Sequence, residues 1–351
     1  MGTMRGLLLG LLLGGTLLAQ GKLESAEALA FGPNGVLFVG DAAAGAVVAF
    51  ETGDVTPTTP PDRFSLDAID QKVAAMFGVK GSDIRFTDVK VNPISKAIYV
   101  SAARGRGPDA TPVLLRVDGS GVMKQVDTEK LKSSRVELPG LPNVPVARRR
   151  TSRTQVITEL QYADGQVIVA GLSNEDFSST LRVVPYPFKK ADRGASIEIY
   201  HTAHFAYETA SPVRTMIPYT SGGEKYLLAA YTCTPLVRLK MSDLKDGAHV
   251  IGDTLAELGR HSSPLDMILY ADRGQDFLLV ANTLHGVQKL RLGDVANYEA
   301  VNEEGGNARQ IPMERISYLK GVVQMDAYDA ERMVVLFDAH TELDLRVLDL
   351  P

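Results

Sequence analysis

The sequence predicts an all-β fold, a six-bladed β-propeller with a short helical insertion after the first blade. Three observations lead to this prediction. A strand, a turn and a second, more apolar strand recur six times, a third strand follows each pair, and turns rich in Gly, Asn, Asp and Pro separate the units. Radial repetition of small sheets explains six copies of one pattern. A two-sheet sandwich, the alternative, does not need them.

The first repeat shows the pattern most clearly, with strands at 29–31 and 36–39 on either side of a Gly-Pro-Asn-Gly turn. The innermost strands are expected near 29–31, 89–91, 160–162, 215–217, 267–269 and 325–327. The third strands are expected at 47–50, 113–117, 181–184, 236–239, 287–290 and 343–347. The last repeat is one strand short, and we expect residues 22–26 to supply that strand and close the ring.

The insertion between the first and second repeats is expected to be helical. A Pro-rich run at 57–61 leads to Ser65, which suits an N-cap. Apolar residues then recur at helical spacing before Gly78, namely Leu66, Ile69, Val73 and Met76. We expect this helix to pack on the rim of the first blade, with partner binding as the alternative.

The start of the chain has the pattern of a secretory signal peptide. Arg5 supplies a positive charge, residues 7–18 are mainly apolar, and Ala19-Gln20-Gly21 is a small-x-small cleavage signal. Cleavage after Ala19 and an uncleaved membrane anchor are the alternatives. Residues 1–21 are therefore expected to be a signal peptide and residues 22–351 a single propeller domain, exported to the periplasm or the cell exterior.

Net charge, cysteine content and hydropathy limit the classes of partner that this protein is expected to bind. The net charge is −5, which favours neither nucleic acid nor acidic lipid. Cys233 is the single cysteine, so no intrachain disulfide is expected. No later apolar run is long enough for a membrane anchor after signal removal. We expect a monomer that binds a small molecule or an exported protein.

Polar residues at the starts of the first strands predict a site at one mouth of the channel. Read within one residue of register, these positions are Glu27, Asp88, Glu159, Arg214, Asp266 and Gln324. Carboxylates crowded at a narrow mouth require a cation, a shared proton or a paired arginine. Glu27 and Asp266 are candidate metal ligands, oxygen donors of this kind favour calcium, and Arg214 is the expected partner without a metal. The alternative is that these side chains cap strand ends and bind channel water.

The ends of the second strands and the turns after them are expected to share this mouth. Polar candidates at the strand ends are Asp41, Tyr231, Asn282 and Asp338. If the ring closes, blades five, six and one are neighbours, and Asn282, Asp338 and Asp41 lie side by side. His285 and His340 occupy similar places in adjacent blades and are candidates for a general base or a ligand.

Other reactive residues have simpler interpretations. Cys233 is a nucleophile only with a lowered pKa and a nearby base, and a buried thiol is favoured instead. His201 and His204, with Glu208, have metal-ligand spacing, but the strand-like alternation of 196–200 points the two histidines apart. The basic run at 148–150, with Arg153, is expected to lie in a long loop rather than to bind a polyanion.

The spacing Glu27-x7-Gly35-x-Leu37-x3-Asp41 resembles the opening blade of the gluconolactonase and regucalcin-like propellers and of NHL-repeat propellers. The resemblance implies that Glu27 is a ligand of a calcium-type ion in the channel, that Asp266 stands for a channel aspartate, and that a lactone is the substrate. The second and third repeats depart from the family's Asn-Asp pair, with Thr87-Asp88 and Thr158-Glu159.

Two function classes follow. The first is a non-catalytic exported propeller that binds a ligand or a protein partner at the channel mouth. The second is a calcium-dependent hydrolase of a lactone or ester, which needs a metal to activate water and an uncoordinated base. The incomplete ligand set favours the binding protein, and the fold alone decides neither.

Overall fold

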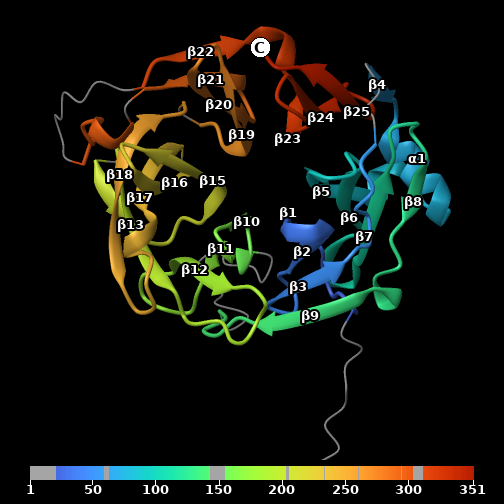
Figure 1. Cartoon of the computed structure of the whole chain (residues 1–351), viewed down its shortest axis with the longest axis horizontal. Coiled ribbons are helices and arrows are strands. Elements are labelled where there is room, and N and C mark those ends of the chain that lie inside the picture. The colour runs from blue at the N-terminus through green and yellow to red at the C-terminus, as the bar shows by residue number, and fades with distance from the viewer. Residues whose placement is uncertain are drawn as a thin grey trace, which may run out of the picture.

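The computed structural model describes residues 21–58, 63–142, 155–202, 205–232, 234–259, 261–293, 295–302 and 311–351. Its strands form sheets arranged radially around a central axis, as in a β-propeller (Figure 1). The predictions for leader residues 1–20, for the arginines at 148–150 and 153, and for His204 and Cys233 lie outside the described residues. Within the described ranges, no helix has the length and apolar character needed to cross a membrane.

Four sheets of the described structure have four antiparallel strands each. From the channel outward, their strands are β1 (Leu29–Phe31), β2 (Val36–Asp41), β3 (Ala46–Glu51) and β9 (Lys132–Glu137); β5 (Ile84–Val91), β6 (Ile98–Arg104), β7 (Thr111–Val117) and β8 (Met123–Gln125); β19 (Pro264–Asp272), β20 (Gln275–Asn282), β21 (Gly286–Leu292) and β22 (Met313–Ile316); and β23 (Val322–Ala327), β24 (Arg332–Asp338), β25 (Leu343–Asp349) and β4 (Phe64–Leu66).

The fifth sheet joins the third and fourth repeats. One half contains β10 (Glu159–Ala163), β11 (Gln166–Leu172), β12 (Ser179–Pro185) and β13 (Ala195–His201), and the other contains β15 (Val213–Ser221), β16 (Glu224–Tyr231), β17 (Pro235–Lys240) and β18 (His249–Glu257). β13 and β18 pair in parallel, and β14 (Ala206–Glu208) adds to β13. The third and fourth repeats therefore share one sheet, because this pairing satisfies two outer edges that would otherwise expose their backbone groups.

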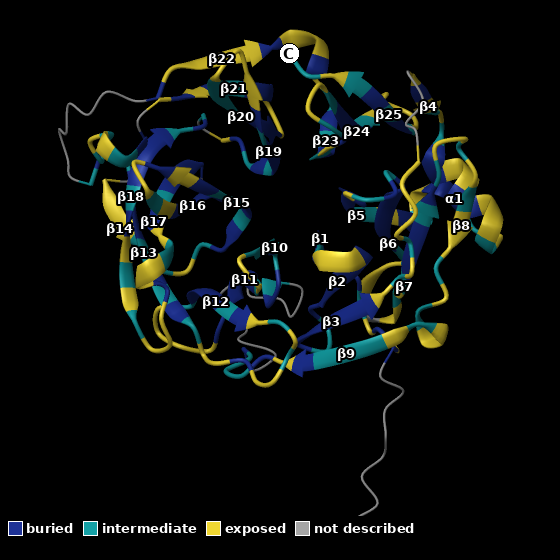
Figure 2. Ribbon diagram, in the orientation of Figure 1, coloured by how far each residue is buried: buried dark blue, intermediate teal, exposed yellow. Residues whose placement is uncertain are grey.

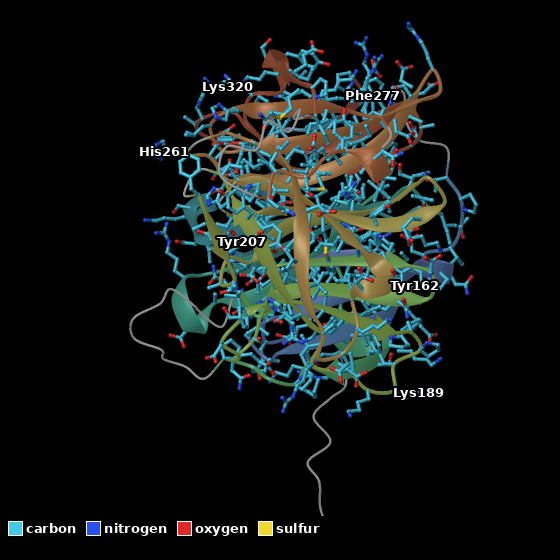
Figure 3. All side chains as sticks on the ribbon, turned by 90° about the vertical axis from the view of Figure 1, so that its left-hand side faces the viewer. Tyr162, Lys189, Tyr207, His261, Phe277 and Lys320 are labelled. Atoms are coloured by element: carbon cyan, nitrogen blue, oxygen red, sulfur yellow. The ribbon has the colours of Figure 1, made fainter. Side chains whose placement is uncertain are left out.

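The first strand of each repeat lies innermost, as predicted. β1, β5, β10, β15, β19 and β23 each begin a sheet or half-sheet, and they contact one another in the closed order β1, β5, β23, β19, β15, β10. In the side view, Lys320 and His261, which precede β23 and β19, lie on one face, whereas Tyr162 and Phe277 lie by the hairpin turns on the other (Figure 3). These first strands therefore begin at the same face of the ring.

The order of the sheets around the ring differs from their order in the sequence. The second repeat lies between the sixth and the first, because β5 contacts both β23 and β1. The expectation that Asn282, Asp338 and Asp41 are neighbours is therefore wrong, since the second sheet separates the last sheet from the first. After β3 the chain visits the sixth sheet, builds the second sheet, and returns to add β9 to β3.

The last sheet is completed by β4 and not by residues 22–26, which corrects the predicted closure. Phe64, Ser65 and Leu66 pair with Val347, Arg346 and Leu345. Both this pairing and that of β9 with β3 join segments that are distant in the sequence. The two pairings cover outer edges and link three neighbouring sheets.

The predicted helix is α1 (Ile69–Phe77), but it begins later than expected because Ser65 lies in β4. Ala68 precedes the helix in the left-handed region with φ 52°, and its N–H donates to Asp344 Oδ1 at 2.9 Å. Gly78 ends the helix with φ 65°, a conformation that favours glycine. The apolar face packs against the second and sixth sheets rather than on the rim of the first.

The hydrophobic core of the described residues consists of six clusters, each between two neighbouring repeats. Leu29 and Tyr99, for example, join the first and second repeats, and Ile268 and Met325 join the fifth and sixth. Buried residues follow the strands, and exposed residues gather in the turns and at the rim (Figure 2). Burial of each large apolar side chain is worth about 1.5–3 kcal/mol, so packing between sheets holds the ring together.

Candidate functional site

A large cavity opens at the face where the first strands begin. Its volume is about 1110 Å³. The lining comes from the segment before β1, the start of β5, the β6–β7 turn, and the fourth, fifth and sixth repeats. Glu27 and Arg214, both predicted for the channel mouth, lie in this lining. We call it the mouth cavity.

A β-bulge near the start of the first strand recurs in at least four repeats. Register shifts leave one extra residue each in β5, β15, β19 and β23, namely Thr87, Arg214, Leu265 and Val323. A bulge bends the strand and redirects a side chain, which explains why Arg214, Leu265 and Val323 line the mouth cavity. The residue after the bulge is Asp88 in β5, Asp266 in β19 and Gln324 in β23.

A narrow hollow, here called the throat, adjoins the mouth cavity. Its volume is about 10 Å³, which is room for about one water molecule. Its lining is Glu27, Ala28, Thr87, Asp88, Thr158, Glu159, Arg214, Leu265 and Gln324. Four of these residues also line the mouth cavity, namely Glu27, Arg214, Leu265 and Gln324. The structure thus brings five of the six predicted strand-start residues to one place.

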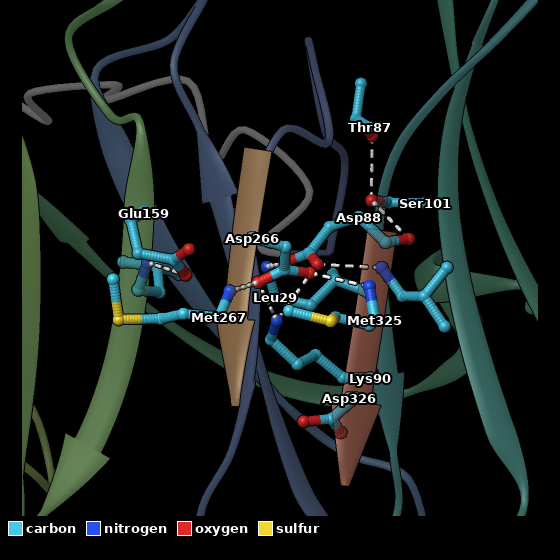
Figure 4. A network of polar contacts seen from close by, with 12 residues as sticks. Leu29, Thr87, Asp88, Lys90, Ser101, Glu159, Asp266, Met267, Met325 and Asp326 are labelled. Carbon is cyan, nitrogen blue, oxygen red and sulfur yellow. Dashed lines mark hydrogen bonds and ion pairs between the residues drawn. The ribbon is translucent and has the colours of Figure 1, made fainter. Parts of the chain in front are cut away.

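Lys90 is the cation at the centre of the buried carboxyl groups (Figure 4). Its Nζ lies 3.0 Å from Asp88 Oδ1 and 4.0 Å from Asp266 Oδ1. The three residues expose at most 7% of their surface. Arg214, the partner that the sequence suggested, makes no such ion pair in the described residues, and Lys90 takes that role instead.

The same carboxyl groups join neighbouring first strands. Asp88 Oδ2 accepts the N–H of Leu29 at 2.7 Å, Asp266 Oδ2 accepts that of Met325 at 2.9 Å, and Asp326 Oδ2 accepts that of Val91 at 2.7 Å. Each bond crosses from one sheet to the next. Innermost strands have no ladder partner on the channel side, so these carboxylates satisfy backbone donors that burial would otherwise leave unpaired.

Burial and mutual repulsion keep part of this cluster protonated. Burial raises the pKa of Glu159 well above its ordinary range, against the attraction of Lys90. For the same reason the pKa of Asp266 rises to about 7 and that of Asp326 to about 6. Burial opposes the charge on Lys90, but the surrounding carboxylates outweigh it and raise the pKa of the ammonium. At neutral pH the cluster therefore holds both a lysine cation and carboxyl protons.

Lys90 and Asp326 were not predicted as site residues, although strand alternation contained the signal. Residues two apart on a strand face the same way, so Lys90 shares the channel side with Asp88, and Asp326 shares it with Gln324. A lysine between two valines of a predicted innermost strand is the sequence signal for an internal cation.

Asp41 has a structural role away from the mouth cavity. It is fully buried, and its carboxylate accepts the N–H groups of Glu24 at 3.0 Å and Ser25 at 2.8 Å. It also accepts the Ala44 N–H at 3.2 Å. Asp41 thus fixes the segment before β1 and the β2–β3 turn, and the structure places it behind the mouth cavity rather than in its lining.

Tyr231 and Asn282 are also buried rather than presented to the mouth cavity. Tyr231 lies in the core cluster between the third and fourth repeats. Asn282 is 3% exposed, and its amide contacts the Leu258 carbonyl and Gln288, each at 3.4 Å. Neither lines the cavity, so both predicted placements are corrected.

The turn histidines lie in adjacent sheets, as predicted, but outside the cavity lining. His285 is half-buried. Burial lowers the pKa of its imidazole, and the positive charge of Arg315 lowers it further. His340 is exposed with φ 78°, and its N–H donates to Asp338 Oδ1 at 2.7 Å. The His340–Asp338 bond stabilises its turn, and His285, Asp338 and His340 do not line the mouth cavity.

Glu27 and Asp266 do not form the arrangement expected of metal ligands. Glu27 pairs with Arg85 at 3.3 Å, whereas Asp266 uses one oxygen on each of two backbone N–H groups and faces Lys90. Among the described residues, no group of three or more His, Cys, Asp or Glu is placed to hold a metal ion. The donors present therefore do not fit a calcium-type ion.

His201 lies at the outer side of the joined sheet and not in the channel. It is 2% exposed, with Glu208 at 3.7 Å from Nδ1 and Glu257 at 3.8 Å from Nε2. The Thr234 hydroxyl lies 3.3 Å from Nε2 and donates to Glu257 at 2.5 Å. This polar cluster links β13, β14 and β18 next to the join between the two half-sheets.

Comparisons with known proteins give only weak structural likeness. No family model matches the chain, and no curated protein matches it in sequence. A Thermus thermophilus protein assigned as an oxidoreductase (glucose dehydrogenase) is 12% identical, covering 93% of this chain and 98% of its own, with a TM-score of 0.35. Domains 1–2 of Drosophila semaphorin 1b are 10% identical over 95% and 88%, with a TM-score of 0.42. Staphylococcus aureus virginiamycin B lyase is 9% identical over 93% and 96%, with a TM-score of 0.39. Likeness of this degree carries no argument about function.

Proposed function

We propose that this protein is an exported β-propeller that binds a small molecule in the mouth cavity without transforming it. The observation that carries the proposal is the cavity of about 1110 Å³ at the face where the first strands begin. Pockets of about 300–1000 Å³ commonly take ligands, and this one has an apolar wall with a few charged groups. Its floor is the throat, where the carboxyl groups are already engaged.

The proposal includes six blades and export. Six core clusters, one between each pair of neighbouring repeats, support counting the two halves of the joined sheet as separate blades. The leader pattern at the start of the sequence supports export to the periplasm or cell exterior. An exported protein partner is the alternative occupant of the mouth, and a monomer is expected.

The alternative function is the calcium-dependent hydrolase of a lactone or ester. Such an enzyme needs a metal-activated water and a free base in the channel. Lys90 occupies the centre of the carboxyl cluster, and Asp88 and Asp266 use their oxygens on backbone N–H groups. No observation at the site favours this second function, so the binding protein is the better-supported proposal.

The test is a small-molecule screen read by the unfolding temperature of the wild-type protein and of Ala110→Trp. Ala110 is a half-buried turn residue in the cavity lining, so a tryptophan there fills space without disturbing a strand. A ligand of the mouth cavity raises the unfolding temperature of the wild type by mass action and not that of Ala110→Trp. Ligands that stabilise both proteins equally would place binding elsewhere, and turnover of a bound lactone would favour the hydrolase.

A further inference from the structure

We propose that the mouth cavity takes an organic anion, with its carboxylate, phosphate or sulfate group on Arg214 and an apolar body along the wall formed by the fifth and sixth repeats. This inference rests on the proposed function, because it assigns a ligand class to the same cavity. It follows from which charged groups in the cavity and the throat already have partners.

Arg214 is the cation without a partner. Within the described residues it makes no hydrogen bond or ion pair, although it lines both the mouth cavity and the throat. The other two cavity arginines are engaged: Arg85 pairs with Glu27 at 3.3 Å, and Arg106 donates to the Ser82 carbonyl at 3.1 Å. Arg214 is therefore the guanidinium that can give all its donors to a ligand.

The carboxyl groups facing Arg214 do not neutralise it. Glu27 is paired with Arg85, and Asp88 is paired with Lys90 and accepts two backbone N–H groups. Burial favours the protonated, neutral form of Glu159. The remaining cavity carboxylates belong to the rim: Glu24 is exposed, and Asp83 accepts the Lys80 N–H at 3.4 Å. A positive charge thus remains at the inner end of the cavity.

The bulge explains why Arg214 is available. It is the extra residue between Val213 and Thr215, which pair with Tyr231 and Ala230. The equivalent extra residues in the next two sheets of the ring are Leu265 and Val323, which give the cavity an apolar wall beside the guanidinium. Leu336 and Leu343 extend this wall on the sixth repeat. A charged group against an apolar surface favours an amphiphilic anion over a fully polar one.

The test uses two fluorescent probes with the same body. 1-Anilinonaphthalene-8-sulfonate carries an anion, whereas N-phenyl-1-naphthylamine lacks it. Titration of the full chain gives a dissociation constant for each probe. We expect Arg214→Gln to weaken the sulfonate by roughly tenfold or more, the effect of losing one charge-assisted contact, and to leave the neutral probe within about twofold. Arg214→Lys should restore part of the loss. Arg193→Gln is the matched control and should change neither constant, because Arg193 lies outside the cavity lining and its side chain is 73% exposed.

Ala110→Trp separates failure of this inference from failure of the proposed function. Selective loss of the sulfonate in Arg214→Gln, with both probes blocked by Ala110→Trp, supports the anion assignment. If Ala110→Trp blocks both probes but Arg214→Gln does not discriminate between them, the cavity binds ligands and the anion assignment is overturned. If both probes still bind Ala110→Trp, the mouth cavity is not the binding site and both proposals fail. A wild-type protein that binds neither probe also overturns the anion assignment.

Discussion

The throat and the mouth cavity adjoin each other in the channel, yet their charged residues have different roles. Asp88 of the throat lining and the neighbouring Asp266 are buried, lie beside Lys90 and accept hydrogen bonds from strands of adjacent sheets. In the mouth cavity, Arg214 comes from the same part of the repeat and has no partner among the described residues. Asp88 and Asp266 follow the bulge residue of their strands, whereas Arg214 is itself the bulge residue. A difference of one residue along the first strand thus separates charges that join neighbouring sheets from a charge that can bind a ligand.

This difference concerns solvation. A buried charge is tolerated only when other groups replace its water, so the throat carboxylates are tied to N–H donors, to Lys90 or to a proton. A half-exposed guanidinium keeps part of its hydration and needs no internal partner. Polar residues at equivalent positions of a repeat therefore cannot all be interpreted as one site.

Removal of the internal cation tests the comparison most strongly. We expect Lys90→Met to lower the free energy of unfolding by about 3–5 kcal/mol, because it leaves Asp88 and Asp266 buried without their counter-charge. Urea unfolding measures the loss. Lys132→Met, at a surface lysine whose side chain is 79% exposed, is the control and should change stability by less than about 0.5 kcal/mol. Equal stability of Lys90→Met and wild type would show that the cluster needs no cation.

The pH dependence of stability sharpens the same point. The pKa of Asp266 is about 7 in the folded protein, against an ordinary value of 3.8. Between about pH 4 and pH 7 the folded state keeps a proton that the unfolded state releases, so the free energy of unfolding falls as pH rises, by up to about 1.4 kcal/mol per pH unit for this group. Asp326 acts in the same direction up to about pH 6.

Urea midpoints between pH 4 and pH 8 measure this slope, and Asp266→Asn is the matched variant. The variant should lose much of the fall in stability over the same interval, because an amide does not titrate there. An identical slope in wild type and Asp266→Asn would mean that Asp266 is not a proton-holding group of the cluster.

The free cation of the mouth cavity should matter little for folding. We expect Arg214→Gln to change the free energy of unfolding by less than about 0.5 kcal/mol, because no partner in the described residues loses a contact. The same urea titration measures it beside Lys90→Met. A loss comparable to that of Lys90→Met would break the comparison by giving Arg214 a structural role in the ring.

Calcium should have the smallest effect. The carboxylate oxygens of Asp88 and Asp266 are occupied by N–H groups and Lys90, so added calcium should shift the unfolding temperature by less than about 1 °C, and chelation should leave it unchanged. Differential scanning calorimetry of wild type and Asp266→Ala checks this. A calcium response present in the wild type and lost in Asp266→Ala would make the throat a metal site and favour the hydrolase.

The sequence predicted the innermost strands and most of the polar ring. Strand alternation identified 29–31 and its equivalents, and polar residues such as Asp88 and Glu159 stood out where the core pattern permits apolar ones. The same alternation places Lys90, two residues after Asp88, on the channel side of its strand, but Arg214 was the predicted counter-charge. Strand-end residues such as Asp41 and Asn282 could not be separated from ligand groups, because the N–H donors that engage them become neighbours only in the folded chain.

The sequence by itself determined the repeat, the strand that lines the channel and the face at which polar groups gather, because each depends on alternation over a few residues. Only the tertiary structure decided the order of the sheets, because the pairing of β4 with β25 and of β9 with β3 joins edges far apart in the chain. It also decided which charges are engaged. The state of Lys90, Asp266 and Arg214 depends on desolvation and on partners from other sheets, and neither is a property of a local segment.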